Sequence, residues 1–298
     1  MEPIQGNVSI DAQNIMPIIK KWLYSDKDIF IREVVSNGCD AITKLRMVDS
    51  AAAQNCSIHV EVDKAARELR FTDDGIGMTE DEVKTNINQV AFSGAKSFME
   101  EYAKNEDKEN SGIIGHFGLG FYSVFMIADK VTIDTLSFRE GATPVRWESE
   151  DGMAFTMTEG TRTTRGTTIT LHVSEAESEF LEQWRVREVL DRYCSFMSVP
   201  IYLEEIKEKK ADDAEVTGEG SNEVKDGEAA EAKKEEPKPI NDTQPLYTRA
   251  PQDCTDEDYK QFYRKVFHEY DDPLFWIHLN VDYPFKLKGI LYFPKIKE

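Results

Sequence analysis

Glu33-Val34-Val35-Ser36-Asn37-Gly38-Cys39-Asp40 is the stretch that decides the fold, together with two others farther along the chain. The second reads Asp73-Asp74-Gly75-Ile76-Gly77-Met78, and the third reads Gly115-His116-Phe117-Gly118-Leu119-Gly120-Phe121. The first offers a carboxylate and a carboxamide four residues apart, which on a helix share one face. The second is an Asp followed by glycines at a turn, and the third is a glycine-rich loop that leads into a helix. A base beside a metal-holding amide, an acceptor for adenine and a phosphate cradle are the parts of an ATP site.

The polar residues of the first stretch continue as a stripe along one helical face. Glu33, Asn37, Asp40 and Lys44 recur at intervals of three and four residues. A solvated helix face would give the same stripe, so the helix alone leaves both interpretations open. Asn37 favours a site because asparagine is a mediocre helix former. In the functional interpretation its carbonyl oxygen binds Mg²⁺, which prefers oxygen ligands, and Glu33 holds the attacking water as general base.

The two glycine-containing stretches are weaker evidence when each is taken alone. Asp73 offers an acceptor for the exocyclic amine of adenine, and the glycines after it let backbone approach the ring. Asp-Gly turns are nevertheless common in ordinary loops. The loop at residues 115–120 either gathers free N–H groups at a helix N-terminus, which suits an anion, or is simply a flexible loop. A P-loop is excluded, because the chain contains no Gly-Lys dipeptide.

Helical and strand periods alternate through most of the chain. Residues 15–23 and 29–45 place apolar residues at three- and four-residue spacing, which predicts amphipathic helices. Alternating polar and apolar residues predict strands at residues 57–62, 68–71, 131–135, 145–148 and 167–173. Helices followed by runs of strands predict an α+β fold, with helices layered on one face of a mainly antiparallel sheet.

Length and composition limit the classes of function. With 298 residues the chain is long enough for about two domains. Its formal charge of −20 argues against a nucleic-acid or anionic-membrane partner, because such surfaces need basic patches. The four cysteines lie far apart without a C-x-x-C pair, which suits a reducing compartment. No stretch approaches the roughly 18 apolar residues of a membrane span, so we expect a cytoplasmic protein.

A change of composition divides the chain. From residue 204 to about residue 243 it consists mainly of Glu, Lys, Asp, Ala and Gly, which predicts a disordered charged linker. Order resumes where Thr255 and Asp258 predict a capping box. We therefore expect three parts: an ATP-binding domain at residues 1–203, the linker at residues 204–243, and the truncated beginning of an α/β domain at residues 244–298.

Several longer stretches resemble a known family. Residues 24–33 resemble its signature helix start, residues 93–99 and 117–123 resemble its lid segments, and residues 245–249 resemble the beginning of its middle domain. The order and spacing of the three deciding stretches resemble the GHKL ATPase superfamily. The flanking residues resemble its ninety-kilodalton heat-shock chaperone family, in the bacterial HtpG type. The resemblance covers essentially the whole chain apart from the linker.

This resemblance implies a role for individual residues. By motif it implies Glu33 as general base, Asn37 at the metal and Asp73 at the adenine amine. It also implies Asn86 near the ribose and phosphates, and Thr167 supporting the adenine end through water. The implied nucleotide-binding set as a whole is Asn37, Asp40, Asp73, Gly77, Met78, Asn86, Gly115, Phe117, Gly118, Leu119, Gly120, Phe121 and Thr167. Residues from about 93 to 120 would form a mobile lid over ATP.

The resemblance also implies an activity and partners. It implies the Bergerat-type two-layer fold, ATP or ADP with Mg²⁺ as cofactors, and slow ATP hydrolysis that drives a chaperone cycle. Unfolded or partly folded client proteins, and possible co-chaperones, are the implied partners. The family's catalytic Arg and its C-terminal dimerisation domain would lie beyond Glu298. We therefore expect a homodimer for the full-length protein, and a slowly hydrolysing monomer for this chain.

One departure and two alternatives stay open. Phe92 stands where the family usually has Lys or Arg, so a basic contact near the nucleotide is missing. A nucleotide-gated interaction module without turnover is one alternative, and Glu33 argues against it because pure binding needs no general base. Another GHKL enzyme, such as a sensor kinase or a mismatch-repair ATPase, is the second. A kinase would need a phosphoacceptor-His helix ahead of Glu33, and residues 1–32 contain no histidine.

Overall fold

A computed structural model describes residues 26–88, 120–206, 237–281 and 287–295 of the chain. The chain divides into two compact units. The first is Met1–Ser195 with Val199–Ile240, and the second is Phe196–Ser198 with Asn241–Glu298. The helix predicted at residues 15–23 and almost all of the predicted lid lie outside the described residues. No helix among the described residues is long and apolar enough to cross a membrane.

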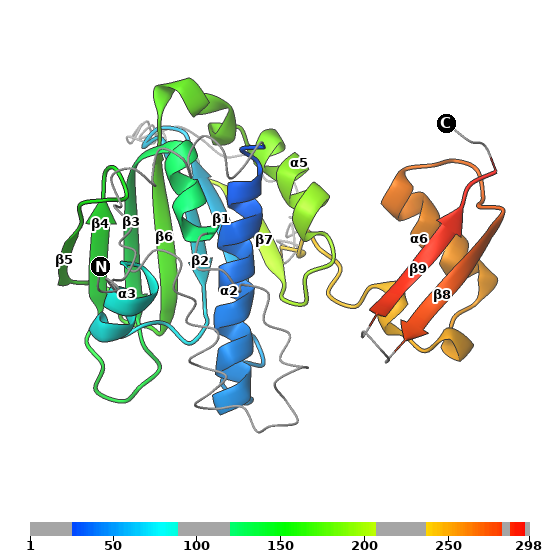
Figure 1. Cartoon of the computed structure of the whole chain (residues 1–298), viewed down its shortest axis with the longest axis horizontal. Coiled ribbons are helices and arrows are strands. Elements are labelled where there is room, and N and C mark those ends of the chain that lie inside the picture. Colours follow the sequence, from blue (N-terminus) through cyan, green and yellow to red (C-terminus); the bar gives the residue numbers. More distant parts are fainter. Residues whose placement is uncertain (1–25, 89–119, 207–236, 282–286, 296–298) are drawn as a thin grey trace, which may run out of the picture. The chain divides into compact units, whose positions relative to one another are not determined.

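The first unit is built on one seven-stranded sheet with the order β5-β4-β3-β6-β2-β1-β7 (Figure 1). Its strands are β1 (Ile58–Asp63), β2 (Glu68–Asp73), β3 (Ala128–Leu136), β4 (Val145–Ser149), β5 (Thr156–Glu159), β6 (Gly166–Val173) and β7 (Ile201–Glu205). Neighbouring strands are antiparallel except β1 and β7, which are parallel. The mainly antiparallel sheet predicted from the sequence is confirmed.

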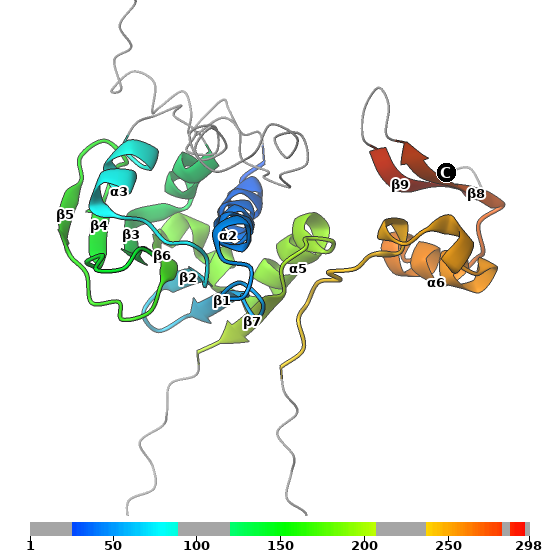
Figure 2. The same cartoon turned by 90° about the horizontal axis from the view of Figure 1, so that it is seen from below.

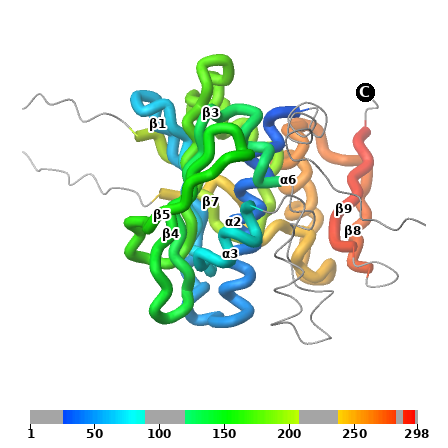
Figure 3. The backbone as a smooth tube through the Cα atoms, turned by 60° about the vertical axis from the view of Figure 1, so that its left-hand side comes forward, coloured from blue at the N-terminus to red at the C-terminus, as the bar shows by residue number. Residues whose placement is uncertain are grey.

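Helices form the second layer. The described ones are α2 (Ile29–Val48), α3 (Glu80–Asn86), α5 (Gln183–Cys194) and the 3-10 helices η2 (Gly120–Met126) and η3 (Glu175–Leu181). Figure 2 and Figure 3 show α2 and α3 on the same face of the sheet. Helix α2 packs against β1, β2, η2 and α5. The α+β two-layer arrangement is confirmed, although the helix predicted after the glycine-rich loop is of the 3-10 type.

The core lies between α2 and the sheet because both elements place apolar residues on one side. Strands β1 and β2 alternate buried and half-buried residues along their length, as period-two strands do. Phe30 of α2 is fully buried, and its ring makes edge contacts with Phe71 at 6.4 Å and with Phe180 at 5.1 Å between centroids. These aromatic contacts fix α2 over β2, and α2 carries the polar stripe of the first stretch.

The second unit contains α6 (Asp256–Phe267), β8 (Phe275–Val281) and β9 (Leu287–Phe293), after two short 3-10 helices, η4 (Leu246–Thr248) and η5 (Pro251–Asp253). The predicted capping box is present: the Thr255 hydroxyl accepts from the Asp258 amide, and the Asp258 carboxylate accepts from the Thr255 amide. Tyr259 of α6 stacks on Trp276 of β8 at 5.0 Å. The strands β8 and β9 pair antiparallel.

Strand β7 extends into the range expected for the charged linker. Its residues Glu204 and Glu205 pair in parallel with β1, and the Ile206 amide donates to the Val62 carbonyl at 2.8 Å. Sheet hydrogen bonds are made by backbone, so the charged residues of this edge strand do not prevent pairing. The Ile240 amide donates to the carbonyl of Ile201, the first residue of β7, at 2.8 Å. Residues 207–236 of the expected linker lie outside the described residues.

Candidate functional site

Helix α2 presents the polar stripe predicted from the sequence. Asp40 is buried, Asn37 is exposed, and the Glu33 side chain is 22% exposed. Lys44 follows one turn after Asp40. Burial lowers the pKa of Lys44, while the charges of Asp40 and Glu82 act in the opposite direction. The stripe is therefore partly enclosed, which distinguishes it from a freely solvated helix face.

The Glu33 carboxylate joins the first and third stretches. A β-carbon added to Gly120, at the start of η2, would lie 2.2 Å from Glu33 Oε2. A side chain at position 120 would therefore force the Glu33 carboxylate or η2 to shift. On its other side Glu33 Oε1 accepts from Arg32 Nε at 3.1 Å and from Arg32 Nη2 at 2.5 Å. Sequence reasoning missed Arg32, because adjacent residues do not share a helix face.

Asp73 ends β2 as a buried carboxylate. Its Oδ1 accepts a hydrogen bond from the Gly75 amide at 2.8 Å, which shapes the turn. Burial raises the pKa of Asp73 to about 7, against the opposing effects of the Gly75 amide, the Arg162 charge and the Thr167 amide. A buried carboxylate whose pKa is shifted this far is a candidate for a functional group.

The glycines after Asp73 let the turn fit tightly between two elements. Gly77 has φ +64°, and a β-carbon there would lie 1.9 Å from the Leu136 carbonyl oxygen. A β-carbon on Gly75 would lie 2.6 Å from the β-carbon of Ala41 on α2. The sequence predicted glycines for close approach to a ligand. In the structure they permit close approach of the turn to α2 and β3.

Thr167 lies beside Asp73. The two residues are register partners between β6 and β2, and both are buried. On its other side Thr167 Oγ1 lies 3.0 Å from Thr135 Oγ1 of β3, which also accepts from the Met78 amide at 3.0 Å. Sequence reasoning missed Thr135. Its signal is a Thr that continues the inward positions of Val131 and Ile133 along the predicted strand.

Arg162 is a further residue that sequence reasoning missed. Its Nη2 donates to the Asp73 carbonyl at 3.3 Å, and its Nη1 donates to Thr168 Oγ1 at 2.5 Å. Its Nε donates to the Thr164 carbonyl at 2.9 Å. Arg162 therefore ties the loop before β6 to the end of β2. No short-range pattern reveals the contact with Asp73, because Asp73 is 89 residues away in the sequence.

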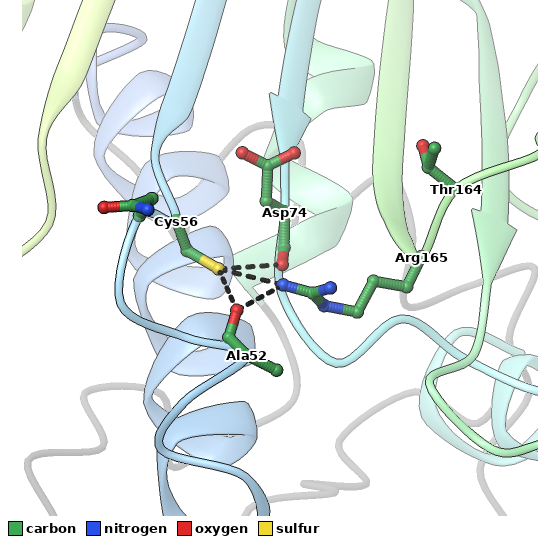
Figure 4. Close-up of a pocket in the computed structure, with 6 residues that line it drawn as sticks. Ala52, Cys56, Asp74, Thr164 and Arg165 are labelled. Atoms are coloured by element: carbon green, nitrogen blue, oxygen red, sulfur yellow. Dashed lines mark hydrogen bonds between the residues drawn. The ribbon is translucent and has the colours of Figure 1, made fainter.

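A small pocket of about 170 Å³ lies beside this loop, lined by Ala52, Asn55, Cys56, Asp74, Thr164 and Arg165. Arg165 Nη2 donates to the Ala52 carbonyl at 2.6 Å and lies 3.3 Å from Cys56 Sγ (Figure 4). The Cys56 thiol in turn donates to the Asp74 carbonyl at 3.2 Å. These contacts join the segment after α2 to the end of β2 and to the beginning of β6.

The remaining predicted site residues lie on other elements, in the core or outside the described residues. Asn86 is half-buried at the end of α3. The Phe121 ring is buried against Trp147 at 5.7 Å, so its side chain belongs to the core. Four predicted phosphate-loop residues lie outside the described residues: Gly115, Phe117, Gly118 and Leu119. Within the described ranges, no group of three or more His, Cys, Asp or Glu could hold a metal ion.

Comparison with known proteins identifies the family. The family described as "Hsp90 protein" matches residues 179–298, and the family described as "Histidine kinase-, DNA gyrase B-, and HSP90-like ATPase" matches residues 30–150. The chain is 46% identical to "Chaperone protein HtpG" of Porphyromonas gingivalis and 47% identical to that of Bacteroides thetaiotaomicron, over 98% of this chain and 40% of each relative. It is 36% identical to the protein of the same name from Shigella dysenteriae, over 95% of this chain and 43% of the relative. The chain thus spans about two fifths of the length of these relatives. Matches of this kind along both units, on the two-layer fold described above, show that the chain belongs to the Hsp90 family, in its HtpG type.

Proposed function

We propose that the first unit binds ATP with Mg²⁺ and hydrolyses it, with adenine at Asp73 and the phosphates toward Glu33. The observation that carries this proposal is the buried Asp73 carboxylate, held in a glycine turn beside Thr167. One oxygen of the carboxylate accepts from the Gly75 amide. Its other oxygen suits the exocyclic amine of adenine, because a buried donor needs an acceptor.

The residues at the other end of the site fit Mg²⁺ and phosphates. Mg²⁺ is held in proteins by one or two oxygen ligands together with waters and substrate phosphates, so a larger acidic cluster is not required. Asn37 is exposed on α2, one turn after Glu33, and would supply its carbonyl oxygen. Gly120 brings the backbone of η2 against the same face. When bound, Mg²⁺ would neutralise developing negative charge on the phosphates.

Glu33 is proposed to orient and deprotonate the attacking water. Its carboxylate is partly exposed on the side of α2 that carries Asn37, and it is held there by the Arg32 guanidinium. A positioned carboxylate base contributes typically 10²–10⁴-fold in rate. Arg32 would fix the direction of the Glu33 carboxylate. Its positive charge would also partly neutralise that carboxylate.

For the longer protein we propose an ATP-driven chaperone. The support is the name of the relatives, "Chaperone protein HtpG", at 46–47% identity. Unfolded or partly folded client proteins would be the substrates, with co-chaperones as possible partners and the cytoplasm as location. A homodimer is proposed for the full-length protein, and a monomer for this chain. No nucleic-acid partner is proposed, because the formal charge is −20.

Titration of labelled ATP and ADP, with and without Mg²⁺, tests the proposal on wild type, Asp73→Asn and Glu33→Ala. Asp73→Asn should abolish binding in a folded protein, because the amide can present a donor where adenine needs an acceptor. Glu33→Ala should bind ATP normally and lose steady-state hydrolysis by about 10²-fold or more.

The two variants separate the proposal from its alternative. Near-normal ATP affinity of folded Asp73→Asn would remove Asp73 from the adenine site. Wild-type hydrolysis by Glu33→Ala would show that the general base lies elsewhere. If neither wild type nor Glu33→Ala hydrolyses ATP although both bind it, the nucleotide-gated interaction module becomes the better description.

A further inference from the structure

The inner face of the sheet changes from apolar to polar at one row of three adjacent strands. The register aligns Thr135 of β3 with Thr167 of β6, and Thr167 with Asp73 of β2. The next row along the same face is apolar and consists of Ile133, Ile169 and Phe71. All three side chains of the polar row are buried, and Thr135 is fully buried. Burying polar groups costs free energy unless they are hydrogen-bonded, so the bonds of this row are informative.

The Thr135 hydroxyl lies where three parts of the candidate site meet. It accepts from the Met78 amide at 3.0 Å, donates to the Gly166 carbonyl at 3.1 Å and lies 3.0 Å from Thr167 Oγ1. A hydroxyl has one proton to donate and two lone pairs to accept with. These three contacts therefore use its whole capacity, and no side chain without a hydroxyl could make them.

Through these contacts Thr135 joins the turn after β2 to Thr167 of β6, the two parts of the proposed adenine site. The turn after β2 is held elsewhere by the Ile76 amide, which donates to the Ala41 carbonyl at 3.1 Å, and by the Phe138 amide, which donates to the Ile76 carbonyl at 2.8 Å. Neither of those bonds reaches β6. The hydroxyl of Thr135 contacts both the turn and Thr167, so it sets the separation between them.

We propose that Thr135 is a positioning residue that sets the preference of this site for a 6-aminopurine. The inference rests on the proposed function, in which Asp73 accepts the adenine amine beside Thr167. Thr135 does not contact the base. It holds the turn after β2 and Thr167 at a fixed separation. The edge of the base that carries the 6-amino group fits between them. Binding of the phosphates, on α2 and η2, does not depend on it.

The test compares ATP with purine riboside triphosphate, which lacks the 6-amino group, by calorimetric titration of the whole 298-residue chain. Wild type should prefer ATP. Thr135→Val keeps the shape of the side chain and removes the hydroxyl, so it should lower the ratio of the two affinities about tenfold. Thr135→Ser restores the hydroxyl and should return the ratio to within about threefold of wild type. A purely structural defect would weaken both nucleotides equally and leave the ratio unchanged.

Thr132 provides the matched control on the same strand. It is also buried, and its Oγ1 has no hydrogen-bond partner among the described residues. Thr132→Val should therefore leave the ratio unchanged. If Thr135→Val does not fold, Thr135→Ala serves in the same comparison, with the same expected loss of preference.

Different failures point to different parts of the argument. If wild type prefers ATP and Thr135→Val keeps that preference, the proposed role of Thr135 is overturned while the proposed function stands. Equal loss of preference in Thr132→Val also overturns it, because the effect would then be general to β3. A wild type without preference for ATP overturns the adenine end of the proposed function, and this inference falls with it.

Discussion

Asp73 is the residue at which folding stability and the proposed nucleotide binding are opposed. Its pKa is raised to about 7 mainly by burial, from an ordinary value of 3.8. The folded protein therefore binds the carboxyl proton of Asp73 more tightly than the unfolded chain does. The contribution of Asp73 to folding is most favourable below pH 3.8 and is lost as the pH rises through about 7. Above pH 7 the buried charge costs on the order of a few kcal/mol.

Asp73→Asn should stabilise the nucleotide-free protein while it abolishes nucleotide binding. The amide has nearly the same shape, can still accept from the Gly75 amide and carries no charge. Thermal unfolding without nucleotide should show a rise in Tm of about 4 °C or more at pH 8, and a smaller rise at pH 5. The exposed Asp129 gives the control, since Asp129→Asn should leave Tm within about 1 °C. A Tm of Asp73→Asn that is equal to or below wild type at pH 8 would contradict this cost of burial.

The residues of the site differ in how far the sequence could predict them. Glu33, Asn37 and Asp73 were predictable because their evidence is local: a helical interval, or a carboxylate before glycines. Thr135 and Arg162 were not, because each bonds a residue that is far away in the sequence: Thr135 Oγ1 accepts from the Met78 amide, and Arg162 donates to the Asp73 carbonyl. Local spacing carries no information about such pairs.

Helices and strands, too, were predictable where a local pattern marks them and not where it is missing. The strands with regular alternation were predicted within a few residues, whereas β5 (Thr156–Glu159) was missed because this edge strand is mostly exposed and has no apolar face. Helix α3 has seven residues, too few for a helical period to be recognised. Its start was nevertheless signalled by a capping box, in which Thr79 and Glu82 exchange bonds.

At the scale of elements, the approach of η2 to α2 should depend on Gly120. A β-carbon there would lie 2.2 Å from Glu33 Oε2, so Gly120→Ala must displace the carboxylate or η2. Steady-state ATP hydrolysis should fall about tenfold or more, because a displaced base loses its alignment with water. ADP affinity should change less, since the adenine end is untouched.

Gly289→Ala is the matched control for this change, because an added β-carbon there meets nothing within 4 Å. It should leave hydrolysis unchanged. If Gly120→Ala hydrolyses ATP as wild type does, then Glu33 in its observed position is not the working base.

Arg185 of α5 anchors the beginning of α2. Its Nη2 donates to Asp28 Oδ1 at 2.5 Å, with side-chain exposures of 17% and 6%. Burial raises the pKa of Asp28, and the Arg185 charge opposes that effect. Arg192 Nη1 also lies 3.6 Å from Asp28 Oδ2, so removing Arg185 leaves the buried carboxylate partly compensated, and the loss should lie at the low end for a broken buried pair.

Arg185→Ala should therefore lower the free energy of unfolding by about 3 kcal/mol at pH 7. The loss should shrink below pH 4, where Asp28 is protonated in the unfolded chain as well as in the folded protein. Arg187→Ala breaks an exposed pair with Asp191 on the same helix and should cost about 0.5 kcal/mol or less. Equal urea midpoints for the two variants would show that the Asp28 contact does not stabilise the fold.

At the scale of the whole molecule, the chain spans about 40% of the length of its curated relatives. The family resemblance implies a catalytic Arg and a dimer contact that the longer protein would add. Steady-state ATP hydrolysis by this chain should then be slower than by a version extended to the full length of the relatives, because one preorganised cation and the effective concentration of the dimer are missing. Equal turnover by the two versions would show that residues 1–298 are sufficient for hydrolysis.

The attachment of Ile206 to β1 and of Ile240 to β7 has a consequence for protein engineering. Both ends of the intervening segment are fixed on two adjacent strands at one edge of the sheet. The length of the segment is therefore largely independent of the geometry at Asp73 and Glu33, and doubling a loop costs only about 0.6 kcal/mol in closure entropy. A guest domain with neighbouring termini, such as a fluorescent reporter, can be spliced in here without cutting the host sheet.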